Sequence, residues 1–193
     1  KMKMKKRVRI AALIMVFVLS ANVAAGCSAK ENHEDIIKKS IIEELDSVKN
    51  MDEKFLNECV EAAGADELEE FGVEPKEFVK VYLEDFDYML GDIIVEGEKA
   101  TVKVTLKCKD FIAYGKELEK AVAEMFSDSG KEKLAGMSEE DLREKLSTLI
   151  LDSMANLETK ETEPIQVDYE LIDDKWVSTL ESEQRLTNVL FPE

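Results

Sequence analysis

The sequence has few of the residues that build the commonest metal and catalytic sites. Its 193 residues include one histidine, His33, three cysteines and no Cys-x-x-Cys pair. A structural zinc ion takes four such ligands, so this composition argues against a zinc site. The chain also contains no Gly-x-Ser-x-Gly, phosphate-loop or dinucleotide-binding motif. The motifs therefore provide no catalytic residue, metal or cofactor, which favours a non-enzymatic protein over an enzyme.

Basic side chains are scarce relative to acidic ones. The chain has 26 Lys and Arg against 43 Asp and Glu, and a net charge of −17. Six of the basic residues and none of the acidic ones lie in residues 1–26, so residues 27–193 carry a net charge of −23. This sign argues against nucleic acid as a partner, because phosphate binding needs a basic surface. It also argues against electrostatic attachment to anionic lipid.

The N-terminal segment has the three parts of an export signal. Six Lys and Arg side chains come first, an apolar run over 10–19 follows, and small residues then lead to Ala24-Ala25-Gly26-Cys27. These last four residues resemble the bacterial lipobox, with alanine at position 24 where leucine is commonest. The resemblance implies cleavage between Gly26 and Cys27 and a diacylglyceryl group on the sulfur of Cys27.

Lipid at Cys27 predicts a protein held on the outer face of the cell membrane. One acyl chain anchors a protein only marginally, whereas two chains anchor it stably. Two alternatives remain open: an uncleaved helical anchor, and an ordinary secretory signal in which Cys27 is incidental. The favoured interpretation divides the chain into a signal peptide (1–26), a lipidated tether (27–34) with a solvated His33, and one domain (35–193).

The hydrophobic pattern of the domain changes period along the chain. Apolar residues at helical spacing predict helices over about 35–49, 52–63, 75–83, 112–126, 138–157 and a short C-terminal segment. Alternation predicts antiparallel strands over about 87–95, 100–109, 165–171 and 175–180. This order predicts an α+β fold: a signal-peptide helix, then a curved antiparallel sheet of about four strands wrapped by helices, with a helical insertion between two hairpins.

Two patterns carry more detailed expectations. In the strand over 100–109, the even-numbered residues point to the core and the odd-numbered ones, up to Lys109, point to solvent. In the helix over 138–157, Ser138 and Asp141 form a capping box. Its Leu and Met stripe is interpreted as core and not as a ligand groove; the stripe consists of Leu142, Leu146, Leu149, Ile150, Met154 and Leu157.

Both hairpins resemble those of the cystatin-like, nuclear-transport-factor-2-like superfamily. The matching stretches are residues 94–105, which follow the pattern v-x-G-d-x-A-x-V-x-V, and residues 167–177, where a Trp follows a polar turn. The chain is also similar to Gram-positive cell-surface lipoproteins that combine a lipobox with this domain. The resemblance implies a cone-shaped sheet with an internal pocket for a small apolar ligand or a protein partner.

Some members of the superfamily are isomerases with an Asp base and a Tyr or Asp donor in that pocket. The residues here that the resemblance suggests for such a pocket are Asp110, Tyr88, Tyr114 and Tyr169. The alternative for Tyr169, which lies on the apolar face of its strand, is a core residue. An open pocket with an Asp–Tyr pair would favour an enzyme, and a filled interior would favour partner binding.

Cys59 and Cys108 both lie on predicted apolar faces. If the helix over 52–63 packs on the sheet, their Cβ atoms can approach to the roughly 4 Å that a disulfide requires. Export makes oxidation feasible, and the alternative is two buried thiols. The leading functional hypothesis is a membrane-tethered, non-enzymatic binding module for a small apolar ligand or a surface protein. An isomerase- or hydrolase-type pocket enzyme and a structural surface protein without a pocket stay open as alternatives.

Overall fold

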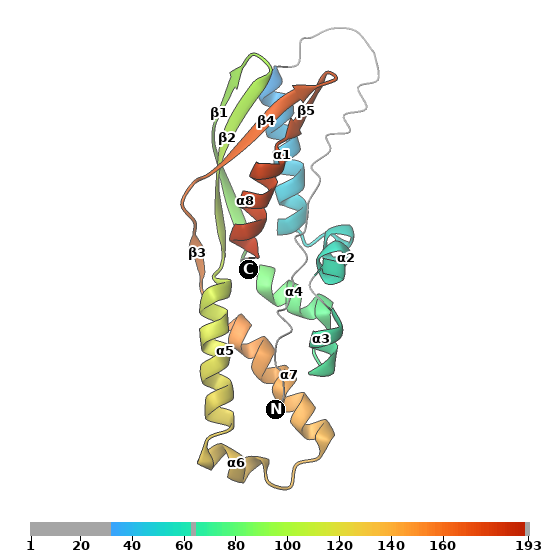
Figure 1. The fold of residues 1–193 in the computed structure, drawn as a ribbon, viewed down its shortest axis with the longest axis vertical. Helices are drawn as coiled ribbons and strands as arrows, with labels where there is room; N and C mark the ends of the chain where they lie inside the picture. Colours follow the sequence, from blue (N-terminus) through green and yellow to red (C-terminus); the bar gives the residue numbers. More distant parts are fainter. Residues whose placement is uncertain (1–31, 63–64, 192–193) are drawn as a thin grey trace, which may run out of the picture.

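The protein has an α+β fold with one open antiparallel sheet (Figure 1). The computed structural model describes residues 32–62 and 65–191. In these ranges the helices are α1 (His33–Lys49), α2 (Glu53–Ala62), α3 (Ala65–Glu70), α4 (Pro75–Leu83), α5 (Phe111–Met125), α6 (Asp128–Leu134), α7 (Glu139–Ala155) and α8 (Leu180–Leu190). The strands are β1 (Asp87–Glu96), β2 (Lys99–Lys109), β3 (Thr159–Glu161), β4 (Ile165–Ile172) and β5 (Lys175–Ser178).

Strand β2 is the centre of the sheet. The strand order is β1-β2-β4-β5, with the short β3 also paired to β2, beyond the end of β4. The two predicted hairpins are confirmed as β1–β2 and β4–β5. Asp173 and Asp174 both have positive φ (50° and 59°), as a tight two-residue hairpin turn requires. The sheet has five strands and not about four, because the three-residue β3 is too short to produce an alternating pattern.

One face of the sheet is filled by helices. The predicted inward residues of β2 are buried, namely Ala100, Val102, Val104, Leu106 and Cys108. Helix α1 packs on β1 and α8 packs on β4 (Figure 1). Ile37 and Ile41 of α1 and Leu186 of α8 join the same hydrophobic core, as does Trp176 of β5. This face is therefore a packed core.

The predicted helical insertion is α5–α6–α7, which extends away from the sheet (Figure 1). Helix α7 packs on α4 and on α5. Helix α5 ends at Met125, and Ser127 then caps the seven-residue helix α6, which the sequence did not indicate. A serine that accepts a hydrogen bond from the third backbone N–H after it starts a helix as readily as it ends one.

Lys109 corrects the predicted alternation of β2. It was expected to face solvent, but its side chain is only 2% exposed. Its ammonium donates to the carbonyl oxygen of Val81 at 2.8 Å and lies 3.5 Å from Oε2 of Glu84. The C-terminal end of α4 presents carbonyl groups without helical partners, and a lysine can satisfy them.

His33 is exposed, as predicted, but it also makes a contact that the sequence did not indicate. It is the first residue of α1, and its Nδ1 accepts a hydrogen bond of 3.0 Å from Nε1 of Trp176. Helix α1 therefore starts inside the predicted tether (27–34), with Asn32 as its N-cap. The signal segment 1–26 and Cys27 lie outside the described residues. No helix within 32–62 or 65–191 is long and apolar enough to span a membrane.

Cys59 and Cys108 are both buried, and each is a free thiol in this structure. The disulfide that the sequence left open is therefore not formed here. Burial raises the pKa of the Cys59 thiol to about 12 and also raises that of Cys108. Two such thiols act as small hydrophobic side chains and react slowly.

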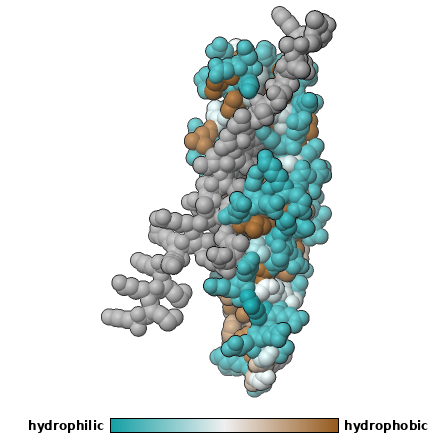
Figure 2. All heavy atoms as spheres, turned by 90° about the vertical axis from the view of Figure 1, so that its right-hand side faces the viewer, coloured by the Kyte–Doolittle hydropathy of each residue, from teal (hydrophilic) through white to brown (hydrophobic). Residues whose placement is uncertain are grey.

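The surface is mostly hydrophilic. Among the described residues visible in Figure 2, hydrophobic side chains form small groups separated by hydrophilic ones. Isolated exposed apolar residues are normal for a protein of this kind.

Candidate functional site: a groove between α5 and α7

Helices α5 and α7 each start with a strong local signal. Asp110 caps α5, and its Oδ1 accepts hydrogen bonds from the backbone N–H groups of Ile112 and Ala113 at 2.9 and 3.0 Å. The predicted capping box of α7 is confirmed, because Ser138 and Asp141 bond each other's backbone N–H. These caps fix the first turn of each helix.

A groove of about 920 Å³ lies between the two helices. Figure 1 shows α5 and α7 close together near β3 and diverging towards α6. The groove is lined by described residues of α5, α7 and the segment that leads into β3: Asp110, Ala113, Glu117, Ala121, Asp141, Glu144, Lys145, Thr148, Leu149, Asp152, Ser153, Asn156, Leu157, Glu158 and Lys160. Its volume lies within the roughly 300–1,000 Å³ of typical ligand sites.

The apolar part of the groove comes from small residues on α5 and from leucines on the other side. Ala113 and Ala121 lie two helical turns apart on one face of α5. Leu149 and Leu157 face them from α7 and from the turn after it. Because alanine side chains are short, the two helices leave a hollow where larger residues would close it.

The stripe of α7, interpreted as core, is core in part. Of its six apolar residues, Ile150 and Met154 are buried, and Leu157 packs against the hydrophobic core. Leu149 and Leu157 also line the groove. The apolar stripe is wider than one helix–helix contact can cover. Part of it faces the core beside α4, and part of it faces α5.

The groove is acidic. Its lining includes six carboxylates and two lysines, which gives a net charge of −4. Within the described part of the chain, Glu144, Asp152 and Glu158 form no ion pair, and Glu117 has only the exposed Lys120 at 3.7 Å. Hydrogen bonds from Ser138 lower the pKa of Asp141, which keeps that carboxylate ionised. A concave site with this excess of one sign attracts cations.

The four residues suggested by the cystatin-like resemblance do not form one pocket. Asp110 lies at one end of the groove. Tyr114 is buried on α5, where its ring packs against Phe78 at 5.8 Å, and burial raises its pKa to about 12. Tyr88 lies between β1 and α1 and donates its hydroxyl proton to Asp46 at 2.7 Å. Tyr169 is a core residue of β4.

The sequence analysis missed a buried polar cluster beneath the sheet. The Tyr169 hydroxyl and Oε2 of Glu44 are buried and have no hydrogen-bond partner among the described residues. Glu183 of α8 is also buried and accepts a hydrogen bond of 2.7 Å from Ser178. The pKa of Glu44 is raised to about 8. Burial is the largest cause, and the negative charges of Glu183 and Glu43 add to it. The signal available in the sequence was the polar Glu44 inside the apolar face of α1.

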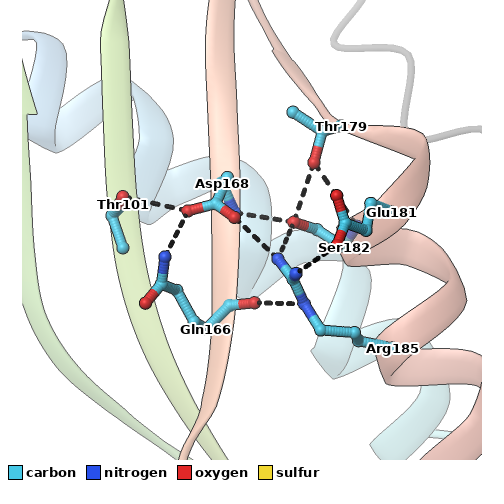
Figure 3. Close-up of polar contacts among 7 residues, drawn as sticks. All are labelled: Thr101, Gln166, Asp168, Thr179, Glu181, Ser182 and Arg185. Atoms are coloured by element: carbon cyan, nitrogen blue, oxygen red, sulfur yellow. Dashed lines mark hydrogen bonds and ion pairs between the residues drawn. The ribbon is translucent and has the colours of Figure 1, made fainter.

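A second polar network joins β2, β4 and α8 (Figure 3). Asp168 accepts hydrogen bonds from Thr101 at 3.1 Å, from Gln166 at 2.8 Å and from Arg185 at 2.6 Å. Burial is the largest single influence and raises the pKa of Asp168, but these bonds together lower it. The backbone N–H of Asp168 donates to Ser182, so α8 covers the part of β4 that lies beyond β5. The network stabilises a sheet edge.

Comparison of the chain with protein families, curated proteins and solved structures finds no match. In the described ranges, no cluster of three or more His, Cys, Asp or Glu is placed to hold a metal ion. The function is therefore argued from the groove and from the N-terminal motif.

Proposed function

We propose that the protein is a membrane-anchored, extracytoplasmic binding module that takes its ligand in the groove between α5 and α7. The observation that carries this proposal is the groove itself, which combines a volume of about 920 Å³ with a lining of apolar side chains and six carboxylates. Concave, partly apolar sites with a few placed polar groups are the usual form of ligand sites.

The proposed anchor is a diacylglyceryl group on Cys27, as the lipobox-like motif implies. The N-cap of α1 is Asn32, only five residues further along the chain. A fully extended peptide of this length reaches about 17 Å. Such an anchor would keep the domain close to the membrane surface and restrict the partners that the groove can meet.

The cystatin-like resemblance remains part of the proposal. An antiparallel sheet with two hairpins and helices on one face is compatible with it. The helices α1 and α8 fill the face where the resemblance implies a pocket, and the groove lies instead in the α5–α7 insertion. We infer that the insertion carries the binding function and that the sheet supports it.

Binding is favoured over isomerase or hydrolase chemistry by where the reactive groups lie. The pair that an isomerase would need, Tyr88 and Asp46, is formed between β1 and α1 and not in the groove. No tyrosine or histidine is among the described residues that line the groove. A structural protein without a site is disfavoured by the groove's volume.

A photocrosslinking experiment in intact cells tests this site whatever the chemistry of the ligand. The crosslinker p-benzoylphenylalanine replaces Ala121, which lines the groove, or Glu119, which lies on the opposite, exposed face of α5. We expect a discrete crosslinked product from position 121 and none from position 119. The same products from both positions, or none from either, would contradict the proposed site.

A further inference from the structure

The groove extends along both helices. On α5 its lining runs from Ala113 to Ala121, and on α7 it runs from Asp141 to Ser153. At 1.5 Å per residue these spans are about 12 Å and about 18 Å. Two diverging helices with small residues on one of them form a trough into which a third helix can pack. A compact ligand would occupy only part of this length.

The charges of the groove define what the ligand must carry. Both helices contribute carboxylates to the lining: Glu117 lies on α5, and Glu144 and Asp152 lie on α7. The two lysines of the lining, Lys145 and Lys160, form no ion pair with them within 4.0 Å among the described residues. The lining also contains apolar side chains, with Ala113 and Ala121 on α5 and Leu149 on α7. A complementary ligand therefore carries both apolar and positively charged side chains.

We propose that the groove binds a basic amphipathic α-helix of a partner protein, an inference that rests on the proposed function of the groove as a ligand site. Apolar side chains of the ligand, spaced at i, i+3, i+4 and i+7, would contact Ala113, Ala121 and Leu149. Its lysine and arginine side chains would lie against the carboxylates of α5 and α7. The apolar residues supply affinity, and the carboxylates select the sign of the ligand's charge.

Charge alone must be separated from this specific arrangement, because the whole protein is acidic and attracts any cation. The chain offers matched pairs for that purpose. Glu117 and Glu144 line the groove, whereas Glu119 and Glu140 are exposed on the same two helices outside it. Both double variants, E117Q/E144Q and E119Q/E140Q, remove two charges and so change the long-range field equally.

The probe is a fluorescein-labelled peptide of 15 residues, with leucine at helical spacing on one face and lysine elsewhere, followed by fluorescence anisotropy. Three further probes vary one property each: a scrambled peptide without an apolar face, a peptide with glutamine in place of lysine, and spermine as a competitor. Binding is measured at 0.05 M and 0.5 M salt, since ion pairs at an exposed rim weaken with ionic strength.

We expect the basic amphipathic peptide to bind at least tenfold more tightly than the scrambled one. E117Q/E144Q should weaken it about fivefold, as loss of two exposed ion pairs implies, and E119Q/E140Q should change it less than twofold. Ala121→Phe, which fills the groove, should abolish binding while the emission of Trp176 stays unchanged. Spermine should not displace the peptide at equal concentration.

Each other outcome overturns the inference. Equal binding of the scrambled peptide, or equal losses in the two double variants, would show charge attraction without a groove site. A second contradicting result is that the glutamine peptide binds as tightly as the lysine peptide and loses its binding in Ala121→Phe. That result would show a groove that binds helices without selecting cations, and the proposed function would stand. If no peptide binds and a small molecule is crosslinked at position 121, the ligand is not a helix. The proposed function as a binding module would still stand.

Discussion

The indole nitrogen of Trp176 donates a hydrogen bond of 3.0 Å to Nδ1 of His33, with the two rings edge to face at 5.5 Å. This contact joins β5, near the end of the chain, to the first turn of α1. Trp176 is the only tryptophan and is 1% exposed, so its fluorescence reports on this junction.

Replacement of His33 by alanine should therefore weaken the start of the domain. We expect the free energy of unfolding to fall by about 1 kcal/mol, because the indole N–H of Trp176 loses its acceptor. Urea denaturation followed by Trp176 emission measures the loss. Lys38→Ala, an exposed change on the same helix, is the control and should alter stability by less than about 0.5 kcal/mol. Equal effects of the two changes would show that the contact contributes nothing.

The buried Glu44 predicts an unusual dependence of stability on pH. Its pKa is raised from 4.5 to about 8, so the folded protein keeps a proton on Glu44 that the unfolded chain has lost. Its contribution to stability is complete below pH 4.5 and declines as the pH rises through about 8, with a slope of at most about 1.4 kcal/mol per pH unit.

Glu44→Gln tests this dependence, because the amide resembles the protonated acid. We expect the variant to be more stable than the wild type at pH 8 and to lack the decline between pH 5 and pH 8. Glu61→Gln, an exposed change on α2, should leave the decline in place. The contradicting result is a free energy of unfolding that changes with pH in the same way in the wild type and in Glu44→Gln between pH 5 and pH 8. It would show that Glu44 is ionised in the folded protein.

Lys109 and Lys107 form a natural comparison on one strand. Lys109→Ala removes the ammonium that bonds the carbonyl of Val81, and we expect a loss of about 2 kcal/mol. Lys107→Ala removes an exposed side chain and should change stability by less than about 0.5 kcal/mol. Chemical denaturation of both variants measures the difference. Similar values would mean that the buried ammonium is not needed to satisfy the end of α4.

The two buried cysteines should be unreactive thiols. In protein with Cys27 replaced by serine, iodoacetamide at pH 8 should leave Cys59 and Cys108 unmodified while the protein is folded, because burial raises the pKa of both. After unfolding without a reductant, mass spectrometry should find two alkylated residues. A mass without any alkylation would instead show that the two residues are bridged.

The sequence was sufficient for features with local causes. The alternation from Ala100 to Cys108 gave the central strand, and the Ser138–Asp141 pair gave the start of α7. The apolar spacing over 75–83 gave α4, which starts at Pro75. Each of these signals depends on backbone geometry and on neighbours within four residues, so it is readable before the fold is known.

Features that depend on distant partners were missed or wrongly assigned. The sequence did not indicate that Leu149 lines a groove, because apolar spacing does not reveal which of two neighbouring helices a side chain will meet. Lys109 was assigned to solvent because its acceptor, Val81, lies on another element. The Glu44 cluster needs α1, β4 and α8 together. The groove exists only because α5 and α7 diverge, and no short pattern encodes that angle.

The proposed location of the protein on the membrane requires lipid at Cys27. The membrane-anchored function proposed above requires it as well. Cells that produce the full chain are grown with tritiated palmitate, and the purified protein and its membrane fraction are counted. We expect label and membrane association for the wild type and for Ser28→Ala, and loss of both for Cys27→Ser. An unlabelled wild-type protein recovered from the cytosol, or label that persists in Cys27→Ser, would contradict the account.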